Sequence, residues 1–110
     1  MPKKFKRNHL QILLALADAP KNGLEIMREV LETTGGRLTL WPGTLYGSLK
    51  ELSRQGCVVE VPAEGQEIRG GSPRYYRMTA RGSSLLKEEL QSLEEVLEVA
   101  RRKRFLEQES

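Results

Sequence analysis

The sequence predicts a mostly α-helical fold with one small β-hairpin and a long C-terminal helix. Three observations support this prediction. Apolar residues recur at helical spacing in three short segments before residue 55. Two short runs of β-forming residues then enclose a segment that contains three glycines. The last segment, residues 80–105, has leucines at alternating intervals of four and three and no proline, which is typical of one long helix.

The first helix is expected over residues 9–17. Asn8 and Gln11 have the spacing of an N-terminal capping pair, and Pro20 ends the helical segment. The apolar residues predicted to share its inner side are Leu10, Leu13, Leu14 and Ala17. His9 has no Cys, Asp or Glu around it in a metal-binding arrangement, so we expect it on the helix surface.

A second helix is expected over residues 23–33, because Asn22 and Glu25 again have the spacing of a capping pair. Gly35 and Gly36 end this helix, since glycine accepts the left-handed conformation that is common at helix C-termini. The predicted inner residues are Ile26, Val30 and Leu31. This segment and the helix that follows it are predicted to form a helix-turn-helix pair.

The third helix, residues 42–54, points most directly to a function. Pro42 suits a first helical position, and Gly56 follows the end of the helix. The residues predicted to face inward are Leu45, Leu49 and Leu52. The opposite side carries Gly43, Gly47, Lys50 and Arg54, with Thr44 and Tyr46 on its flanks. A helix enters the major groove of DNA only where its backbone can approach closely, and this side combines two glycines with two cations.

A solvated helix face with incidental glycines is the alternative for this side. Glycine inside a helix costs up to about 1 kcal/mol relative to alanine, and a plain surface gives no reason for that cost at Gly47. We therefore prefer DNA recognition. Two roles stay open for Tyr46, which either contacts a phosphate through its hydroxyl or braces the third helix.

Two strands are predicted over residues 57–61 and 74–78, and residues 62–73 form a long tip between them. Arginines placed to contact the DNA backbone or minor groove are Arg69, Arg74 and Arg77. Glutamates nearby make a solubilising charge mixture the alternative. Of Tyr75 and Tyr76, one is expected in the core and one half-exposed, and Cys57 is expected to be buried. With the three helices, this hairpin makes a winged helix-turn-helix.

The last helix, residues 80–105, begins after Thr79, a natural N-cap. It carries a heptad seam formed by Leu86, Leu90, Leu93, Leu97 and Ala100. A seam this long can pack on its own small domain over only part of its length, so the remainder requires a partner, most simply a second copy. Folding back onto the first helix is the alternative. We expect residues 1–79 to bind DNA and residues 80–110 to dimerise.

Charge and composition restrict the class of protein. The net charge is +3, with 13 Lys/Arg against 8 Asp/Glu in residues 1–82, and 5 against 7 in the remainder. The first part suits a polyanion such as double-stranded DNA. A single cysteine excludes an internal disulfide and is compatible with the cytoplasm, and no apolar run is long enough to cross a membrane. Without paired carboxylates, an activated nucleophile or a phosphate loop, we expect neither an enzyme nor a cofactor or metal site.

Three blocks of the chain resemble the PadR family of bacterial transcription regulators. The first runs from Ile12 to Ile26 and includes Pro20, and the second runs from Pro42 to Gly56. The third is Gly70-Gly71 followed by residues 74–82. The resemblance implies a winged-helix homodimer, usually a repressor that a small molecule releases. Such an effector would bind near the dimer centre between the last and first helices, against Leu93 and Val96. Trp41 departs from the pattern, which has a small polar residue there.

Together these observations predict a PadR-like repressor that binds an inverted-repeat operator as a homodimer. A winged helix used only for contact with another protein is the alternative. An apolar outer side on the third helix would favour that alternative, whereas Lys50, Arg54 and a basic wing favour DNA.

Overall fold

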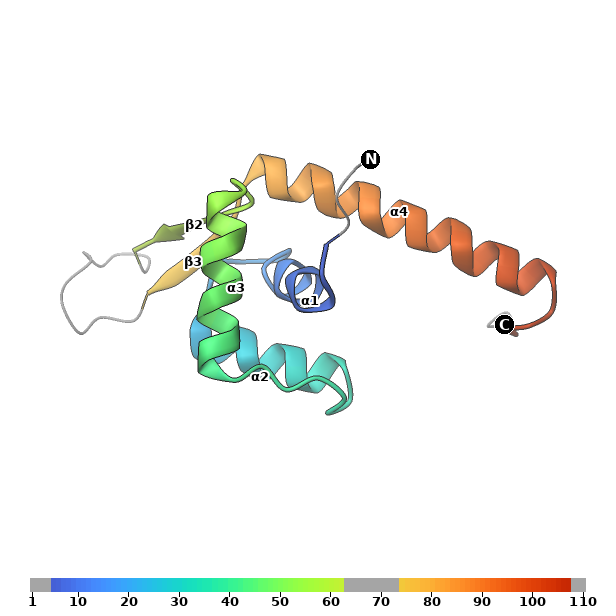
Figure 1. Cartoon of the computed structure of the whole chain (residues 1–110), viewed down its shortest axis with the longest axis horizontal. Coiled ribbons are helices and arrows are strands. Elements are labelled where there is room, and N and C mark those ends of the chain that lie inside the picture. The colour runs from blue at the N-terminus through green and yellow to red at the C-terminus, as the bar shows by residue number, and fades with distance from the viewer. Residues whose placement is uncertain (1–4, 63–73, 108–110) are drawn as a thin grey trace.

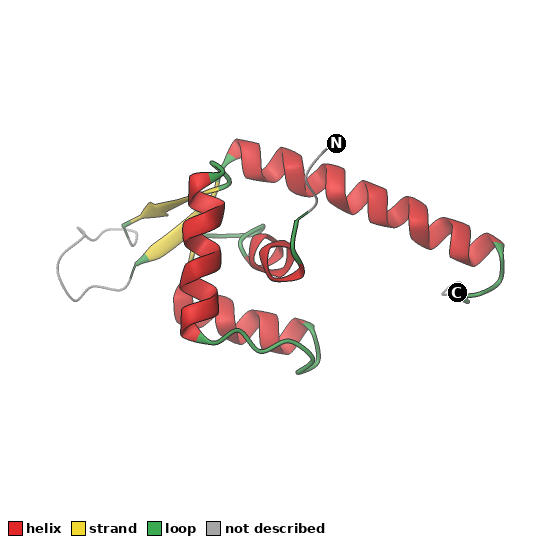
Figure 2. Ribbon diagram, in the orientation of Figure 1, coloured by secondary structure: helices red, strands yellow, loops and turns green. Residues whose placement is uncertain are grey.

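The computed structural model describes residues 5–62 and 74–107. Its elements are α1 (Arg7–Ala15), β1 (Lys21–Asn22), α2 (Gly23–Thr33), α3 (Pro42–Arg54), β2 (Val58–Val61), β3 (Tyr75–Met78) and α4 (Ala80–Arg102). Helices α1, α2 and α3 pack around a common core with the sheet beside α3, and α4 crosses this body and extends beyond it (Figures 1 and 2). The predicted mostly helical winged-helix architecture with a long C-terminal helix is confirmed.

The sheet has a third strand that the sequence pattern did not predict. Strands β2 and β3 form the expected antiparallel hairpin, with Val58 opposite Met78. On the other side of β3, Lys21 of β1 lies opposite Tyr76, so the order is β1-β3-β2. A strand of two residues is too short to show an alternating pattern. Its pairing anchors the start of α2 to the sheet.

Helix α1 differs from its prediction in register and in cap. It begins at Arg7 after Lys6, whose side chain makes no capping hydrogen bond, so the predicted pairing of Asn8 with Gln11 is wrong. Ile12 is completely buried, whereas Leu14 is exposed, and His9 lies in the interior rather than on the surface. The buried residues His9, Ile12, Leu13 and Leu16 recur at intervals of three, one and three, which is also a helical stripe.

The predictions for α2 and for the hairpin core are largely confirmed. Asn22 and Glu25 form a complete capping box, in which each side chain accepts a hydrogen bond from the backbone N–H of the other residue. Leu31 was expected inside but is exposed, while Ile26 and Val30 are buried. The inner residues of the hairpin are Cys57, Val58 and Tyr76, and Tyr75 is half-buried as expected. Burial raises the pKa of the Cys57 thiol, which keeps it protonated.

Lys21 of β1 joins three parts of the fold. Its ammonium group donates to the Ala15 carbonyl and to the Asp18 carboxylate, and lies 3.4 Å from the Glu29 carboxylate of α2. Burial opposes the charged form of Lys21, but the hydrogen bond to Asp18 and the charge of Glu29 outweigh it, so its pKa is raised. The hydrogen bond from Lys21 lowers the pKa of Asp18. The cluster therefore connects the end of α1 with α2.

Lys21→Met should destabilise the protein by about 2 kcal/mol, because it removes charged hydrogen bonds from a side chain that is only 14% exposed. The Asp18 part of the effect is present above the ordinary pKa of 3.8 and is lost as the pH falls through the lowered pKa. The Lys21 part is present below 10.5 and is lost as the pH rises through the raised pKa. Urea unfolding at pH 3 and pH 7 checks this, with Lys87→Met on the exposed side of α4 as control. An equal loss for both variants would contradict it.

The start of α4 is packed tightly against Gly56 and Cys57, just before β2. Thr79 accepts a hydrogen bond from the Gly82 N–H, as a side-chain N-cap does, and its own hydroxyl donates to the Gly56 carbonyl. A methyl group at Gly82 would lie 2.3 Å from the Cys57 carbonyl oxygen. This contact fixes the direction in which α4 leaves the domain. The helix ends at Arg102, three residues earlier than predicted, and Arg104 then adopts a left-handed conformation with φ 59°.

Candidate nucleic-acid interface

Helix α3 presents the two sides that the leucine spacing predicted. Pro42 begins the helix and Gly56 follows its end with φ +78°. The inward residues Leu45, Ser48, Leu49 and Leu52 are buried against the other helices. The residues exposed on the other side, here called the outward face, are Gly43, Thr44, Gly47, Lys50 and Arg54. In the described residues, this face has no covering element (Figure 1).

The glycines in the helices fall into two groups. A methyl group at Gly82 would collide with the Cys57 backbone, so the protein's own packing requires glycine there, and one at Gly23 would displace the Tyr46 side chain. A methyl group at Gly43 or Gly47 would meet no atom within 4 Å. Nothing in the described part of the chain therefore explains why α3 lacks side chains at these two positions.

Positive charge on the outward face is partly paired. The Arg54 guanidinium lies 3.0 Å from the Glu51 carboxylate, one turn earlier on α3. Such an exposed pair contributes little to stability and exchanges readily for another anion. Lys50 is exposed near the middle of the face. The face can thus offer two cationic donors next to two positions with no side chain.

Tyr46 connects α3 with the start of α2. Its hydroxyl would lie 2.3 Å from a methyl group placed on Gly23, so the ring rests directly against that glycine. Nearly half of the side chain is nevertheless exposed. The packing on Gly23 supports the bracing role among the two roles considered for Tyr46, and the exposed part leaves room for a phosphate.

The wing, defined as β2, β3 and the residues between them, places its arginines on different faces of the sheet. Arg74 lies 3.7 Å from the Glu60 carboxylate of β2. It belongs to the same alternating set as Tyr76, whose pKa is raised by burial and then by the charge of Glu60. Arg77 belongs to the opposite set. Arg69 lies outside the described residues.

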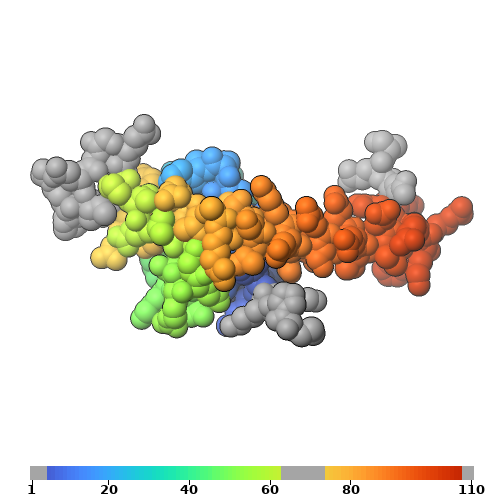
Figure 3. Space-filling view, turned by 90° about the horizontal axis from the view of Figure 1, so that it is seen from above, coloured from blue at the N-terminus to red at the C-terminus, as the bar shows by residue number. Residues whose placement is uncertain are grey.

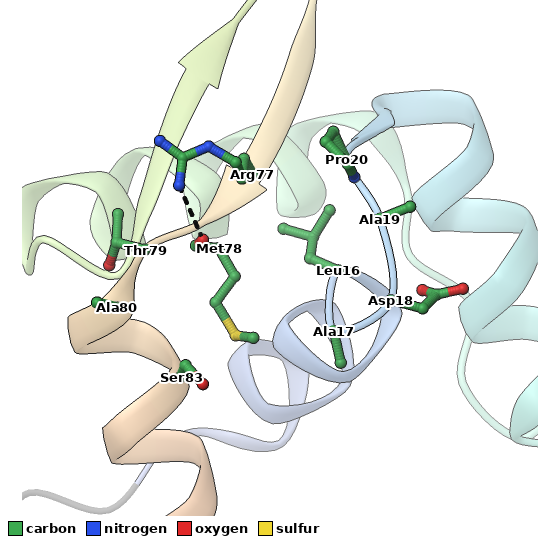
Figure 4. Close-up of a pocket in the computed structure, with 10 residues that line it drawn as sticks. All are labelled: Leu16, Ala17, Asp18, Ala19, Pro20, Arg77, Met78, Thr79, Ala80 and Ser83. Carbon is green, nitrogen blue, oxygen red and sulfur yellow. Dashed lines mark hydrogen bonds between the residues drawn. The ribbon is translucent and has the colours of Figure 1, made fainter.

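Arg77 lies beside an open hollow of about 320 Å³ between the end of α1, the end of β3 and the start of α4 (Figure 4). Its guanidinium donates to the Met78 carbonyl oxygen at 3.4 Å. Leu16, Asp18 and Ser83 also line the hollow. This position separates Arg77 from Arg74. It also differs from the place expected for an effector, between α4 and α1 near Leu93 and Val96, which stays a prediction.

The leucine seam of α4 divides between two environments. Leu86 is 4% exposed and belongs to the core of its own protomer. The prediction that it contacts a partner is therefore wrong. Leu90 packs partly against the same core. Beyond it, Leu93 and Leu97 are 40% and 41% exposed, and Val96 is more exposed still. The alternative in which α4 folds back fully onto α1 is therefore wrong.

The space-filling view shows the outer half of α4 projecting from the body with no neighbouring element in the described residues (Figure 3). We call its apolar residues the α4 stripe, made up of Leu90, Leu93, Val96, Leu97 and Ala100. Together with the burial of Leu86 in the core, this arrangement gives one helix two functions along its length. The inner half holds the domain together, and the outer half leaves an apolar surface uncovered.

Sequence reasoning missed two features near the interface. Trp41 was noted only as a departure from a family pattern, yet it is a large exposed aromatic at the N-terminus of α3. The apolar residues Leu38 and Leu40, which alternate with polar ones before it, could have indicated that Trp41 faces outward. The pairing of Arg74 with Glu60 depends on the register of β2 and β3, which the sequence does not show.

Among residues 5–62 and 74–107, no cluster of His, Cys, Asp and Glu has the arrangement of a metal site. Within the same residues, no helix is both long and apolar enough to span a bilayer.

Comparison with known proteins assigns the family. The profile of the transcriptional regulator PadR-like family matches residues 12–88. Over 87 residues, 79% of this chain and 76% of the relative, the sequence is 36% identical to the transcriptional regulator Rv3488 of Mycobacterium tuberculosis. The chain spans only 21% of another relative, a 37.1 kDa transposon protein of Streptomyces fradiae.

Solved structures agree with this assignment. A PadR-like transcription factor of Bacteroides fragilis is 29% identical with a TM-score of 0.69, and the alignment covers 86% of each chain. A PadR family regulator of Clostridium difficile shares the fold at 23% identity, with a TM-score of 0.73 over 88% of this chain and 97% of that one. With its winged helix, its uncovered α3 face and its projecting α4, this chain is a member of the PadR-like family of transcriptional regulators.

Proposed function

We propose that the protein is a cytoplasmic repressor that binds an inverted-repeat operator as a homodimer. Helix α3 reads base edges in the major groove, and the wing contacts the sugar-phosphate backbone. Residues 1–79 supply the DNA-binding surface, and residues 80–110 supply the dimer contact. Bound to the operator, the dimer excludes other proteins from the same stretch of DNA.

The observation that carries this proposal is the open space around Gly43 and Gly47. At Gly47, inside α3, glycine costs up to about 1 kcal/mol relative to alanine, and no packing within the described residues requires glycine at either position. A major groove about 12 Å wide accepts a helix most closely where side chains are absent. Lys50 and Arg54 lie beside this part of α3 and supply hydrogen-bond donors for bases and phosphates. A purely protein-binding face would favour apolar side chains at these positions.

The α4 stripe supports the dimer. Its leucines recur at intervals of four and three, as in helices that pack side by side. A second copy covers the stripe with an identical stripe, so one two-fold axis buries both. The same axis brings two α3 helices to one side of the assembly. Two identical readers related by a two-fold axis require an inverted repeat, with half-sites about one helical turn apart.

Release by a small molecule is the remaining part of the proposal. The effector site is placed at the dimer centre, between α4 and α1, where Leu93 and Val96 provide an aliphatic lining. Ligand binding there changes the angle between the two protomers and hence the distance between the two α3 helices. Trp41 lies far along the chain from that lining, at the start of α3.

Lys50→Ala and Arg74→Ala should impair DNA binding in different ways. Lys50 reaches base edges, so its loss should cost roughly 1–3 kcal/mol per base contact and flatten the preference at one symmetric pair of positions. Arg74 contacts phosphate, so its loss should lower the affinity for all duplexes about equally, whatever their sequence. Because the dimer loses two phosphate contacts, the slope of log K against log salt should fall by about 1.8.

A salt titration of each variant on a selected operator and on a random duplex tests this assignment. Lys87→Ala, which removes an exposed charge from α4, is the matched control and should bind both duplexes as the wild type does. If Lys50→Ala lowers the affinity for both duplexes equally while Arg74→Ala alters the base preference, then Arg74 reads bases and Lys50 contacts phosphate. If both variants bind as the wild type does, α3 does not read DNA. That result would favour the alternative in which the winged helix contacts another protein.

A further inference from the structure

Trp41 occupies the N-cap of α3, where two of its properties are unfavourable for the isolated protomer. Its side chain makes no capping hydrogen bond, although serine, threonine, aspartate or asparagine at this position would satisfy a free N–H of the first turn. Its indole is also 70% exposed to solvent. Neither property helps the isolated protomer to fold. A binding partner that covers the indole would account for both.

The segment leading into α3 holds Trp41 in place. Leu40 is buried and Leu38 is partly buried against the core, while Arg37, Thr39 and Trp41 are exposed. This alternation turns every second side chain outward along the turn between α2 and α3. The Trp41 carbonyl accepts a hydrogen bond from the Leu45 N–H, which ties the residue to the first turn of the helix. Trp41 is therefore anchored by its backbone and its neighbours, while its ring stays uncovered.

The surroundings of the indole indicate which partner covers it. Gly43 lies two residues further on, with nothing near the position of its missing side chain, and it belongs to the outward face of α3. The N-terminal residues of a recognition helix are the ones that approach the bases most closely. Arg37 adds a cation to the same exposed set of the turn. A polyanion with flat, partly apolar sugar and base surfaces fits this combination, whereas an apolar protein surface leaves Arg37 without a purpose.

We propose that Trp41 is a DNA-contact residue. Its ring packs on a deoxyribose or a base edge at the rim of the major groove, and its Nε1–H donates to a phosphate oxygen. Arg37 contacts the backbone beside it. This inference rests on the proposed DNA binding and extends the interface from the outward face of α3 into the turn that precedes it.

The chain has a single tryptophan, so its fluorescence reports on this position alone. Titration of the full-length protein with a duplex selected from a random pool should change the Trp41 emission. The change should saturate at the same duplex concentration as the anisotropy of a dye on the DNA. Trp41→Ser should lower the affinity for that duplex by about tenfold or more, as loss of a covered interface tryptophan does. Serine also supplies a capping oxygen, so this variant should melt no lower than the wild type.

Leu31→Ser is the matched control, because it removes another large apolar side chain, 42% exposed, from α2, outside both the outward face of α3 and the α4 stripe. It should bind the duplex as the wild type does. Should Trp41→Ser fold poorly, Trp41→Phe, which removes the N–H and shrinks the ring, provides the same comparison. If the emission of wild-type Trp41 does not change on titration, the DNA anisotropy rises normally and Trp41→Ser binds as tightly as the wild type, the Trp41 assignment is overturned and the proposed function stays intact. No anisotropy change for the wild type would instead refute DNA binding itself.

Discussion

Leu93→Glu is expected to turn the dimer into a monomer at micromolar concentration and to reduce operator affinity by at least about a hundredfold. Leu93 lies in the middle of the α4 stripe, and the second copy would have to bury two unpaired carboxylates there. A monomer contacts one half-site at a time, so the gain from linking two readers is lost. Sedimentation and DNA binding measured on the same samples check both effects.

Gln91→Glu is the control for this change, because it adds the same charge to the same part of α4 on the side away from the stripe. It should remain dimeric and keep its operator affinity. Leu97→Glu should repeat the result for Leu93→Glu. Since both leucines are already partly exposed in the protomer, the variants should retain their helical circular dichroism. A wild-type protein that sediments as a monomer would remove the basis for an inverted-repeat operator.

Adding one methyl group should have opposite effects at two glycines. Gly82→Ala should destabilise the protein by about 2–3 kcal/mol, because the methyl group collides with the Cys57 backbone and forces the start of α4 away from it. Gly47→Ala should stabilise it by up to about 1 kcal/mol, because the position is open and alanine favours the helix. Operator affinity should nevertheless fall about tenfold or more for Gly47→Ala, since the added methyl group holds α3 away from the bases.

Urea unfolding at one fixed protein concentration separates the two stability effects, because a dimer's apparent stability depends on concentration. Operator titration of Gly47→Ala then compares stability with function in one variant. Higher stability with unchanged DNA affinity would contradict a DNA-reading role for the outward face of α3. Equal losses of stability for both alanine variants would contradict the packing described at Gly82.

Sequence patterns predicted α2 and α3 nearly to the residue, because both have local signals at each end. Asn22 and Glu25 form the predicted capping box, and Pro42 and Gly56 bound α3. The inward leucines of α3 then determine which side is left outward. The outward residues followed from helical periodicity, which depends only on neighbours along one helix. Their contact with DNA stays a prediction.

Features that depend on distant parts of the chain were not predictable in this way. Strand β1 exists because β3 offers Lys21 and Asn22 a pairing edge, and two residues show no pattern of their own. In α1, two apolar stripes compete, and the packing of α2, α3 and α4 selects the one that buries His9 and Ile12 instead of Leu14.

The sequence by itself determined the long amphipathic C-terminal helix, the outward residues of α3 and the family, because each rests on local spacing or on motif order. Only the tertiary structure decided how the leucine seam divides, with Leu86 in the protomer core and Leu93 left uncovered. The reason is geometric. Helical periodicity shows which residues share a side, but the length of α1 beneath α4 decides how much of that side the protomer can cover. Likewise, only strand register placed Arg74 beside Glu60 and turned Arg77 toward the hollow.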